Sequence, residues 1–336
     1  MNRRPLLFVV LIVLGGLAWW ISSRSGSTTL DRPLSDFAVG DTARVTRIFI
    51  ADQQGRHIDL KRTNKGWSLN DVFMAKPHDV NMLLRTFKRA EVKSPVPKAA
   101  EAHTLRVMGA SSKKVEIYQG GDVPTKIWIV GHGTQDHFGT YMLLEKPGEG
   151  RSNAPFILGM GGFIGTLAQR FHTKLDDWRS TEVAAFPDLH DLMTVELETP
   201  LAPANSYRID QDMDGRFSLL NYLGKPYAFD TVLVQGAILT LKQMNFERIE
   251  RLEQATRDSL LSATPSHILR LTDRAGKKNT TKLWYLPYTA AAPTFDMAQP
   301  LFDDMRMYGL VQDTLVVIMQ RPQLERVLQP ISNFSR

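Results

Sequence analysis

The chain combines one long apolar run with many short alternating segments. Residues 5–22 (PLLFVVLIVLGGLAWWIS) carry no charge. From Phe37 onward, apolar and β-branched residues alternate with polar ones in runs such as VTRIFIAD and HIDLKRT, which predicts antiparallel strands joined by tight turns. Other runs repeat apolar residues at spacings of three and four, which predicts helices. The pattern therefore predicts an α+β fold, in which an N-terminal transmembrane helix precedes mainly antiparallel strands with packed helices.

The apolar run predicts a transmembrane signal anchor over residues 1–23. As a helix it would span about 27 Å, close to the hydrocarbon thickness of a bilayer. It ends in WWIS, where an interfacial aromatic belt would sit, whereas a cleaved signal peptide has a shorter apolar core and a small-residue exit. A cleaved signal and a buried core helix are the alternatives. Arg3 and Arg4 before the run, against Arg24 after it, favour a cytoplasmic N-terminus with the body on the opposite side.

The order of predicted elements repeats along the chain. Residues 24–36 are small and polar and predict a flexible linker. Strands ending in GWSLN, a helix, a second helix and a hairpin containing KIWIV then predict a first α+β module, residues 37–185. The same order returns with RFSLLN, two helices and a hairpin containing KLWYL in residues 186–336. Because fixed order with similar spacing is the mark of a repeated unit, we predict an internal duplication.

Capping residues and periodicity predict the helices of both modules. His78 or Asp79 is expected to cap a helix whose apolar residues share one face. These residues are Val80, Leu83, Leu84, Phe87 and Ala90. Asp230 is expected to cap the corresponding helix, VLVQGAILTLKQM. Further helices are predicted in KAAEAHTLRV, in EQATRDSLLSA and through GTLAQRF.

Composition excludes several classes of protein. The 336 residues, 43% of them hydrophobic, can fill one large or two medium cores. The absence of cysteine excludes disulfides, thiolate zinc sites, iron–sulfur clusters and cysteine nucleophiles. The net charge of +6 falls by three when Arg3, Arg4 and Arg24 are assigned to membrane topology, and the rest is interleaved with acids. Nucleic-acid binding is therefore not expected. The basic stretch DRAGKKN predicts the solvated tip of a hairpin.

The stretch DQDMDGRFSLLN, residues 210–221, matches part of the EF-hand calcium loop. Its acids stand at the first, third and fifth positions and its glycine at the sixth. Its last position is Asn221, which cannot replace the bidentate glutamate, and prolines rather than helices flank it. It aligns instead with the turn before GWSLN, so we predict a hairpin turn. Asp210, Asp212 and Asp214 remain a weak calcium candidate, and no other metal site is expected.

The remaining chemical motifs are incomplete. GMGGFIG, residues 159–165, opens a predicted helix but has Ile164 where a dinucleotide loop needs its third glycine. His132 and His137 bracket Asp136 in a predicted polar turn that lacks a further patterned ligand. The GxSxG, HExxH and phosphate-loop patterns are absent from the sequence. We therefore expect neither a cofactor nor a catalytic residue, and we expect the protein not to be an enzyme.

Three segments of the body carry a family resemblance: GWSLN, RFHTKLDDWRSTEVAAFPDLHDLMTVELETP and AFDTVLVQGAILTLKQMNFERIE. With the anchor, they resemble an uncharacterised family of single-span inner-membrane proteins from Gram-negative envelopes, often found beside auxiliary components of gliding-type ABC transporters. The resemblance covers most of residues 37–336. Its signatures are Phe171, Trp178, Arg179 and the strand at Tyr207. It brings no catalytic residues, and the acidic turn is not part of its pattern. The resemblance implies a single-pass protein of the bacterial inner membrane with a periplasmic body.

Two functions remain open at this point. The first is a non-enzymatic, membrane-anchored periplasmic scaffold or accessory subunit of an envelope transport or secretion complex. Its expected partners are the inner membrane, through residues 5–22, and an envelope protein, such as an ABC-type transporter or secretion component. KIWIVG and KLWYL are expected to offer module edges to a partner strand. The alternative is a membrane-tethered ligand-binding or hydrolytic domain, because many sites are recognisable only in three dimensions.

Overall fold

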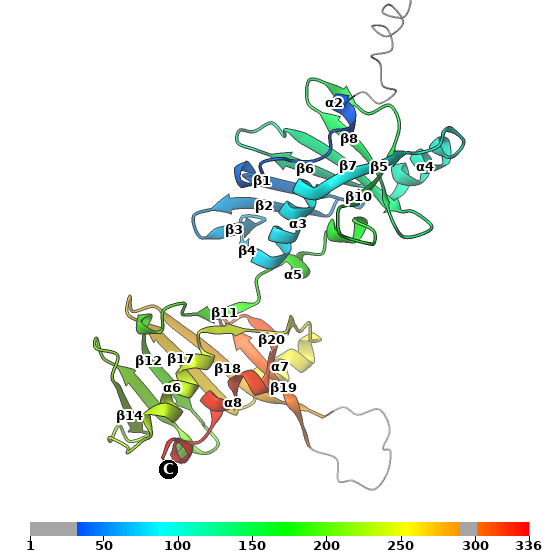
Figure 1. Cartoon of the computed structure of the whole chain (residues 1–336). Helices are drawn as coiled ribbons and strands as arrows, with labels where there is room; N and C mark the ends of the chain where they lie inside the picture. The colour runs from blue at the N-terminus through cyan, green and yellow to red at the C-terminus, as the bar shows by residue number, and fades with distance from the viewer. Residues whose placement is uncertain (1–31, 289–300, 336) are drawn as a thin grey trace, which may run out of the picture. The chain divides into compact units, whose positions relative to one another are not determined.

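The computed structural model describes residues 32–288 and 301–335 (Figure 1). The chain divides into two compact units, Met1–Ser180 and Thr181–Arg336. The strand pairs within the described residues are all antiparallel, and the fold is α+β, as predicted. The predicted span at residues 5–22 lies outside the described residues. In the described part of the chain, no helix has the length and apolar character needed to cross a membrane.

Unit 1 is a ten-stranded sheet with helices on both faces. Its main elements are α2 (Arg32–Ser35), β1 (Arg47–Ala51), β2 (His57–Thr63), β3 (Gly66–Leu69), β4 (Phe73–Met74), α3 (Pro77–Arg89), β5 (Ala90–Pro95), α4 (Lys98–Ser111), β6 (Lys113–Tyr118), β7 (Lys126–Gly133), β8 (Thr140–Lys146), β9 (Gly150–Arg151), β10 (Phe156–Met160) and α5 (Leu175–Trp178). The strand order is β4-β3-β2-β1-β6-β7-β8-β10-β5, with β9 paired to β8. Residues 32–35 of the predicted linker therefore form α2.

The core of unit 1 lies between its sheet and α3. Alternate residues of the strands point into it, and α3 adds Val80, Leu83 and Phe87, which are fully buried. Phe87 meets Trp128 edge to face, with ring centroids 5.1 Å apart. Such aromatic pairs contribute about 1 kcal/mol beyond the area that they bury. The periodicity thus predicted the buried face of α3 correctly, although Leu84 is only partly buried.

Unit 2 contains an eight-stranded sheet and a small two-stranded one. Its main elements are β11 (Glu182–Ala185), β12 (Leu192–Glu198), β13 (Tyr207–Gln211), β14 (Phe217–Asn221), α6 (Thr231–Thr240), β15 (Gln243–Asn245), β16 (Arg248–Ile249), α7 (Gln254–Ser262), β17 (His267–Asp273), β18 (Lys278–Pro287), β19 (Phe302–Val311), β20 (Leu315–Gln320) and α8 (Arg321–Leu328). The large sheet has the order β14-β13-β12-β17-β18-β19-β20-β16, and β11 pairs with β15.

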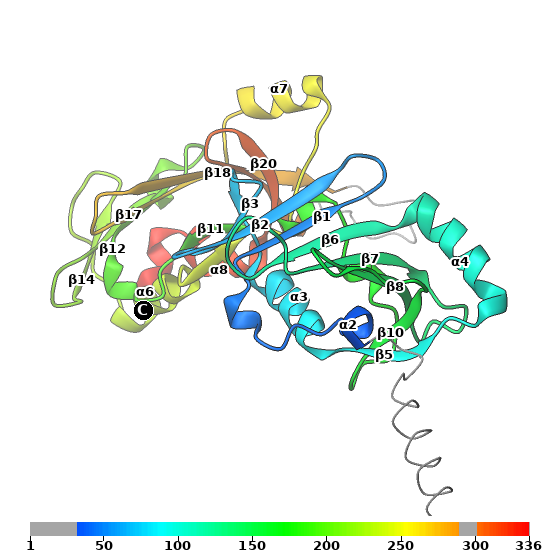
Figure 2. The ribbon, with the colours of Figure 1, turned by 90° about the horizontal axis from the view of Figure 1, so that it is seen from above.

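Helices cover both faces of the large sheet in unit 2. α6 and α8 pack side by side over the larger core, to which they contribute Val234, Ile238, Leu324 and Val327. α7 lies on the opposite face, where its leucines cover a smaller cluster around Trp284 (Figure 2). Successive residues of a strand point to opposite faces, so the strands of this sheet bury apolar side chains on both sides.

The two large sheets run through their strands in the same order. Apart from the short extra edge strand β4 of unit 1, each begins with three antiparallel strands, continues through a helix to a strand at the far edge, and then adds a helix and four strands in the middle. GWSL forms β3 and FSLLN forms β14, which hold the same place in the two orders. KIWIV lies in β7 and KLWYL in β18, which also hold matching places. The helices α3 and α6 correspond in the same way.

The strands containing KIWIVG and KLWYL are not edges, contrary to the sequence prediction. β7 pairs with β6 and β8, and β18 pairs with β17 and β19. Both are buried on their two faces at several positions, for example Ile127 and Trp128 in β7 and Leu283 and Trp284 in β18. Because each strand has a hydrogen-bonded neighbour on both sides, neither offers an unpaired edge to a partner strand. The described edge strand β16 is short and carries Arg248, which discourages strand addition.

Two helix predictions need correction as well. α3 begins at Pro77 after Lys76, and no side chain caps it. Proline is favoured at the first helical position because its missing N–H has no partner there anyway. Neither His78 nor Asp79 is therefore the cap. The segment GTLAQRF forms only a 3-10 turn, Ala168–Arg170. There the Leu167 N–H bonds to Thr140 Oγ1 at 2.7 Å instead of to a helical carbonyl.

Candidate functional site

The acidic turn lies at the tip of the β13–β14 hairpin. The side chain of Asp212 accepts hydrogen bonds from the backbone N–H groups of Asp214 (2.9 Å) and Arg216 (2.8 Å). Asp214 pairs with Arg216 at 3.0 Å, and Asp210 accepts a hydrogen bond from Arg208 Nε at 2.7 Å. Each carboxylate thus has its own partner, and the residues form the predicted hairpin. Within residues 32–288 and 301–335, no group of three or more His, Asp or Glu side chains is placed to hold a metal ion.

The other sequence candidates are also separated by the fold. His132 lies in β7 and not in the predicted turn, because the strand continues to Gly133. Burial, with a smaller effect of His103, lowers the pKa of His132. Asp136 accepts a hydrogen bond from the N–H of Phe138 at 3.0 Å and shapes the turn that contains His137. The glycines of GMGGFIG end β10 and form a turn, because Gly162 and Gly165 adopt positive φ angles of 73° and 140°.

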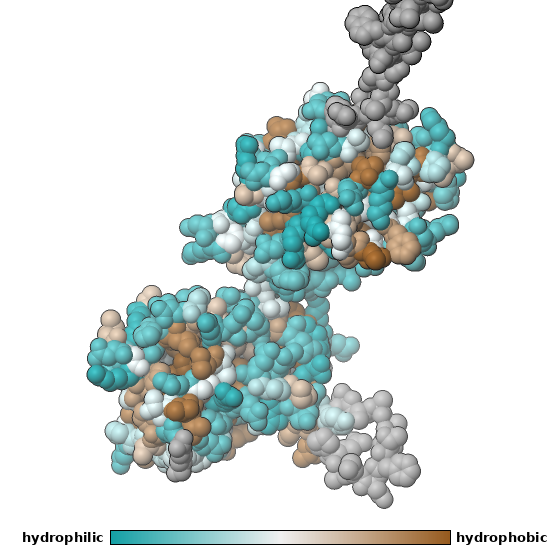
Figure 3. Space-filling view, viewed as in Figure 1, coloured by the Kyte–Doolittle hydropathy of each residue, from teal (hydrophilic) through white to brown (hydrophobic). Residues whose placement is uncertain are grey.

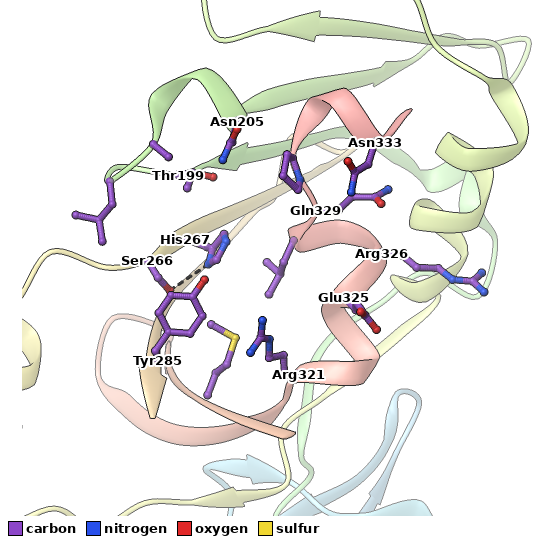
Figure 4. Close-up of a pocket in the computed structure, with 15 residues that line it drawn as sticks. Thr199, Asn205, Ser266, His267, Tyr285, Arg321, Glu325, Arg326, Gln329 and Asn333 are labelled. Carbon is purple, nitrogen blue, oxygen red and sulfur yellow. Dashed lines mark hydrogen bonds between the residues drawn. The ribbon is translucent and has the colours of Figure 1, made fainter. Parts of the chain in front are cut away.

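A cavity of about 670 Å³ opens in unit 2, between one end of the sheet and α8. Its lining comes from the end of β12 and the loop after it, from the start of β17, from β18 and β19, and from α8 with the segment that follows (Figure 4). Clefts of about 300–1,000 Å³ with a few convergent polar groups are typical of small-ligand sites. The polar groups that converge here are His267, Tyr285 and Arg321.

Ser266 and His267 form a hydrogen-bond chain with a defined direction. The Ser266 hydroxyl donates to the backbone carbonyl of Leu283 at 3.0 Å. Its oxygen lies 3.0 Å from His267 Nδ1. With the hydroxyl proton directed to the Leu283 carbonyl, the hydrogen-bond network assigns the imidazole proton to Nδ1, which donates it to the serine oxygen. His267 Nε2 is then a hydrogen-bond acceptor.

This direction is the reverse of a catalytic Ser–His pair. A histidine base activates a serine by accepting its proton, whereas His267 donates to Ser266. The burial of His267, assisted by the positive charge of Arg321, lowers its pKa to about 4. Only 8% of the residue is exposed. The imidazole is therefore neutral near pH 7, and its Nε2 lone pair has no hydrogen-bond partner among the described residues.

Arg321 brings a positive charge to the same cavity. It is the first residue of α8, and its guanidinium carbon lies 5.6 Å from the centre of the Tyr285 ring. Figure 4 shows Arg321 pointing toward Tyr285 and His267, whereas Arg326 extends to the other side of α8. Arg326 lies beside Gly236 of α6, in agreement with this view. No carboxylate of the described residues lies within ion-pair distance of Arg321.

A second surface of unit 2 is unusually apolar. The helix α6, TVLVQGAILT, contains no charged residue. Val232, Leu233 and Leu239 are 65%, 37% and 57% exposed. In Figure 3, hydrophobic side chains gather over this helix. The corresponding helix of unit 1, α3, exposes polar residues instead, namely His78, Asn81, Arg85, Lys88 and Arg89.

Comparisons with protein families, with curated proteins and with solved structures found no match. The family resemblance drawn from the sequence thus stays a prediction. The function is therefore inferred from the fold, the cavity of unit 2 and the apolar face of α6.

Sequence reasoning did not find the residues of the cavity. His267 and Tyr285 come from the two strands of one hairpin and Arg321 from a helix near the end of the chain, and none of them belongs to a motif with a known spacing. The apolar character of α6 was visible in the sequence, since VLVQGAIL lacks any charge. An amphipathic surface helix carries a polar outer face, and the absence of such a face was the available signal.

Proposed function

We propose that this chain is a non-enzymatic accessory protein of the Gram-negative inner membrane, which holds a partner protein of the envelope through the exposed face of α6. The body lies in the periplasm, and residues 5–22 anchor it as a single span. One observation carries the proposal: α6 exposes Val232, Leu233 and Leu239 to solvent and has no charged residue. Contiguous exposed apolar surface marks interaction sites on soluble proteins.

The comparison between the two units supports this interpretation. The matching strand orders favour an internal duplication, in which α3 and α6 descend from one ancestral helix. α3 kept a charged outer face, while α6 did not. The charges on the outer face of a surface helix keep that face solvated. A copy of the helix whose outer face binds a partner is expected to lose those charges. Arg326, beside Gly236, adds a polar rim to the apolar face.

The anchor and the resemblance supply the place and the kind of partner. A single helix encloses no channel, so transport needs other subunits. Tethering at the membrane raises the local concentration of the body for a neighbour without requiring tight binding. The family resemblance points to an ABC-type transporter or a secretion component as that neighbour.

Photo-crosslinking in intact cells tests the proposal. A photoreactive amino acid at position 239, in α6, is expected to give a defined product with an integral envelope protein. The same amino acid at position 88, on the outer face of α3, is not. Leu239→Lys is expected to remove that protein from the complex purified in mild detergent. Val123→Lys, which adds the same charge at an exposed apolar residue of unit 1, is the matched control and is expected to retain it.

Two outcomes would count against this function. One is identical crosslinked products from positions 239 and 88. The other is full retention of the partner by Leu239→Lys. In either case the alternative, a membrane-tethered ligand-binding domain, would gain, since the cavity with its buried neutral His267 specifically favours it.

A further inference from the structure

We propose that the cavity of unit 2 binds a carboxylate whose carrier also presents an N–H or O–H donor. In this site Arg321 pairs with the carboxylate, and His267 Nε2 accepts the donor. The inference goes beyond the partner-binding function and does not depend on it, because the cavity is lined by the sheet and α8 and not by the exposed face of α6.

Arg321 supplies the charge for this ligand. Its guanidinium carbon lies 5.6 Å from the centre of the Tyr285 ring, and Arg321 forms no ion pair with a described carboxylate. It is also the first residue of α8, where the helix dipole disfavours a positive charge. An anion beside Arg321 relieves this repulsion. The planar fork of a guanidinium matches a carboxylate with two parallel hydrogen bonds.

The charge of the cavity favours a single negative charge over a phosphate. Of the two arginines that line it, Arg326 extends away from the cavity (Figure 4). Glu325, also on α8, adds a negative charge to the rim, and His267 is neutral. One inward guanidinium offers a paired contact to a single carboxylate, whereas a dianionic phosphate would bring a second negative charge into a cavity that already carries Glu325.

The second contact is set by the direction of the hydrogen-bond chain. The Leu283 carbonyl fixes the Ser266 hydroxyl, and the hydroxyl fixes the His267 tautomer. Nε2 is consequently an acceptor without a partner in a residue that is 92% buried, since 8% is exposed. His267 lines the open cavity, so a ligand donor can take the place of water at Nε2.

Two sources present this chemistry. One is a small 2-amido or 2-hydroxy acid, and the other is the free C-terminus of a peptide, whose last N–H precedes its carboxylate. The volume of about 670 Å³ accommodates either. The shared chemistry is the carboxylate with a neighbouring donor, and the experiment separates the sources.

Titrations of the full chain in detergent micelles, labelled with ¹³C at histidine, test the site by NMR at pH 7.5. The probes are N-acetylalanine, N-acetylalaninamide, propionate, and trialanine with a free or an amidated C-terminus. We expect N-acetylalanine and free trialanine to shift the His267 ring signal in a saturable manner. The two amides are expected to leave it unchanged. Propionate, which lacks the donor, is expected to bind more weakly than N-acetylalanine.

Three variants assign the contacts. Arg321→Gln is expected to weaken binding about tenfold or more, because it removes a charge-assisted pair. Arg321→Lys keeps the positive charge but lacks the planar fork, so its affinity for the carboxylate probes is expected to lie between those of the wild type and Arg321→Gln. Arg326→Gln removes a charge from the same helix and is expected to bind like the wild type. An unchanged far-UV circular dichroism spectrum for each variant shows that the fold is retained.

The outcomes decide between the sources and can overturn the site. Tighter binding of free trialanine than of N-acetylalanine assigns the cavity to peptide C-termini, and equal binding assigns it to small acids. Equal shifts from free and amidated probes would overturn the proposal. So would equal losses in Arg321→Gln and Arg326→Gln, or the absence of a saturable shift with every carboxylate.

Discussion

Asp212 closes the β13–β14 turn by accepting a hydrogen bond from the backbone N–H of Arg216, four residues further along, at 2.8 Å. Gly215 stands between them with a φ of 79°, which favours glycine. The same side-chain bond occurs in three other turns with a glycine at the matching place: Asp52 to Arg56 (3.1 Å), Asn221 to Lys225 (3.0 Å) and Asp273 to Lys277 (2.8 Å). The apparent calcium motif is therefore one case of a turn that the chain uses repeatedly.

This turn predicts that calcium does not stabilise the protein. Replacing Asp210, Asp212 and Asp214 together by asparagine is expected to leave the melting temperature equally insensitive to calcium and to a chelator. Asp212→Ala, which loses both turn bonds, is expected to cost about 1 kcal/mol of unfolding free energy in either condition. Differential scanning calorimetry measures both. If calcium raises the melting temperature of the wild type but not that of the triple variant, the turn binds the ion, because a ligand that binds only the folded state must stabilise it.

His267 predicts a loss of stability in acid. Its folded pKa of about 4 lies below the ordinary value of 6.5, because burial and Arg321 disfavour the charged imidazole. The unfolded chain then binds a proton from pH 6.5 downward, while the folded chain does not until about pH 4. The contribution of the neutral His267 imidazole to the unfolding free energy is complete above pH 6.5. It falls as the pH drops toward 4, and the loss is about 2–3 kcal/mol at pH 4.5.

The comparison with His267→Gln isolates this effect. Urea unfolding of both proteins at pH 7.5 and pH 4.5 gives the difference in unfolding free energy at each pH. The wild type is expected to lose about 2–3 kcal/mol relative to the variant between these values. Tyr285, Ser266 and Arg321, which also face His267, are the same in both proteins, so the difference between the two proteins reports on His267. Parallel losses in the two proteins would show that His267 titrates normally.

Tyr207 predicts a specific cost for losing one hydroxyl. It is 3% exposed, and its hydroxyl donates to the backbone carbonyl of Val327, at the end of α8, at 2.5 Å. Burial raises the pKa of Tyr207. Tyr207→Phe is expected to lower the unfolding free energy by about 1–2 kcal/mol, because it leaves a buried carbonyl without a donor. Tyr222→Phe, at a residue that is 54% exposed, is the control and is expected to have no effect in urea unfolding.

The sequence predicted features that depend on neighbouring residues. Asp230 caps α6 as expected, with its side chain accepting a bond from the N–H of Val232 at 2.8 Å. The DRAGKKN turn lies between β17 and β18, as the alternating runs on both sides indicated. The helix start at Pro77 was missed. His78 and Asp79 are polar and resemble capping residues, but they already lie inside the helix, because Pro77 occupies its first position.

Features that depend on distant residues were missed. The interior positions of β7 and β18 follow from their pairing on both sides, and the edge prediction took no account of it. The cavity joins His267 at the start of one strand with Arg321 on the last helix. No local sequence pattern indicates that these two residues line one cavity. The segment GTLAQRF failed as a helix for the same reason, since Thr140 of β8 takes the Leu167 N–H.

The predicted anchor leads to a test of tethering. In one chimera an unrelated transmembrane helix of the same orientation replaces residues 1–23, and in a second a cleaved signal does so. If the anchor serves to hold the body near its neighbour, the first exchange keeps recovery of the partner. The second releases the body and lowers that recovery, because a tether raises the effective concentration of the body for its neighbour.

Copurification with the α6 partner from mild detergent measures the effect, and equal expression of both chimeras is the control. Leu239→Lys in the tethered chimera separates the two contributions, since it removes the apolar contact but keeps the tether. A weak contact at α6 depends strongly on the local concentration of the body, so release of the body and Leu239→Lys are each expected to lower recovery of the partner. Together they are expected to lower it by more than the sum of the two separate losses. Full recovery of the partner by the released body would show that the contact suffices without the membrane. Loss of recovery on the exchange of one transmembrane helix for another would instead place part of the recognition within residues 1–23 themselves.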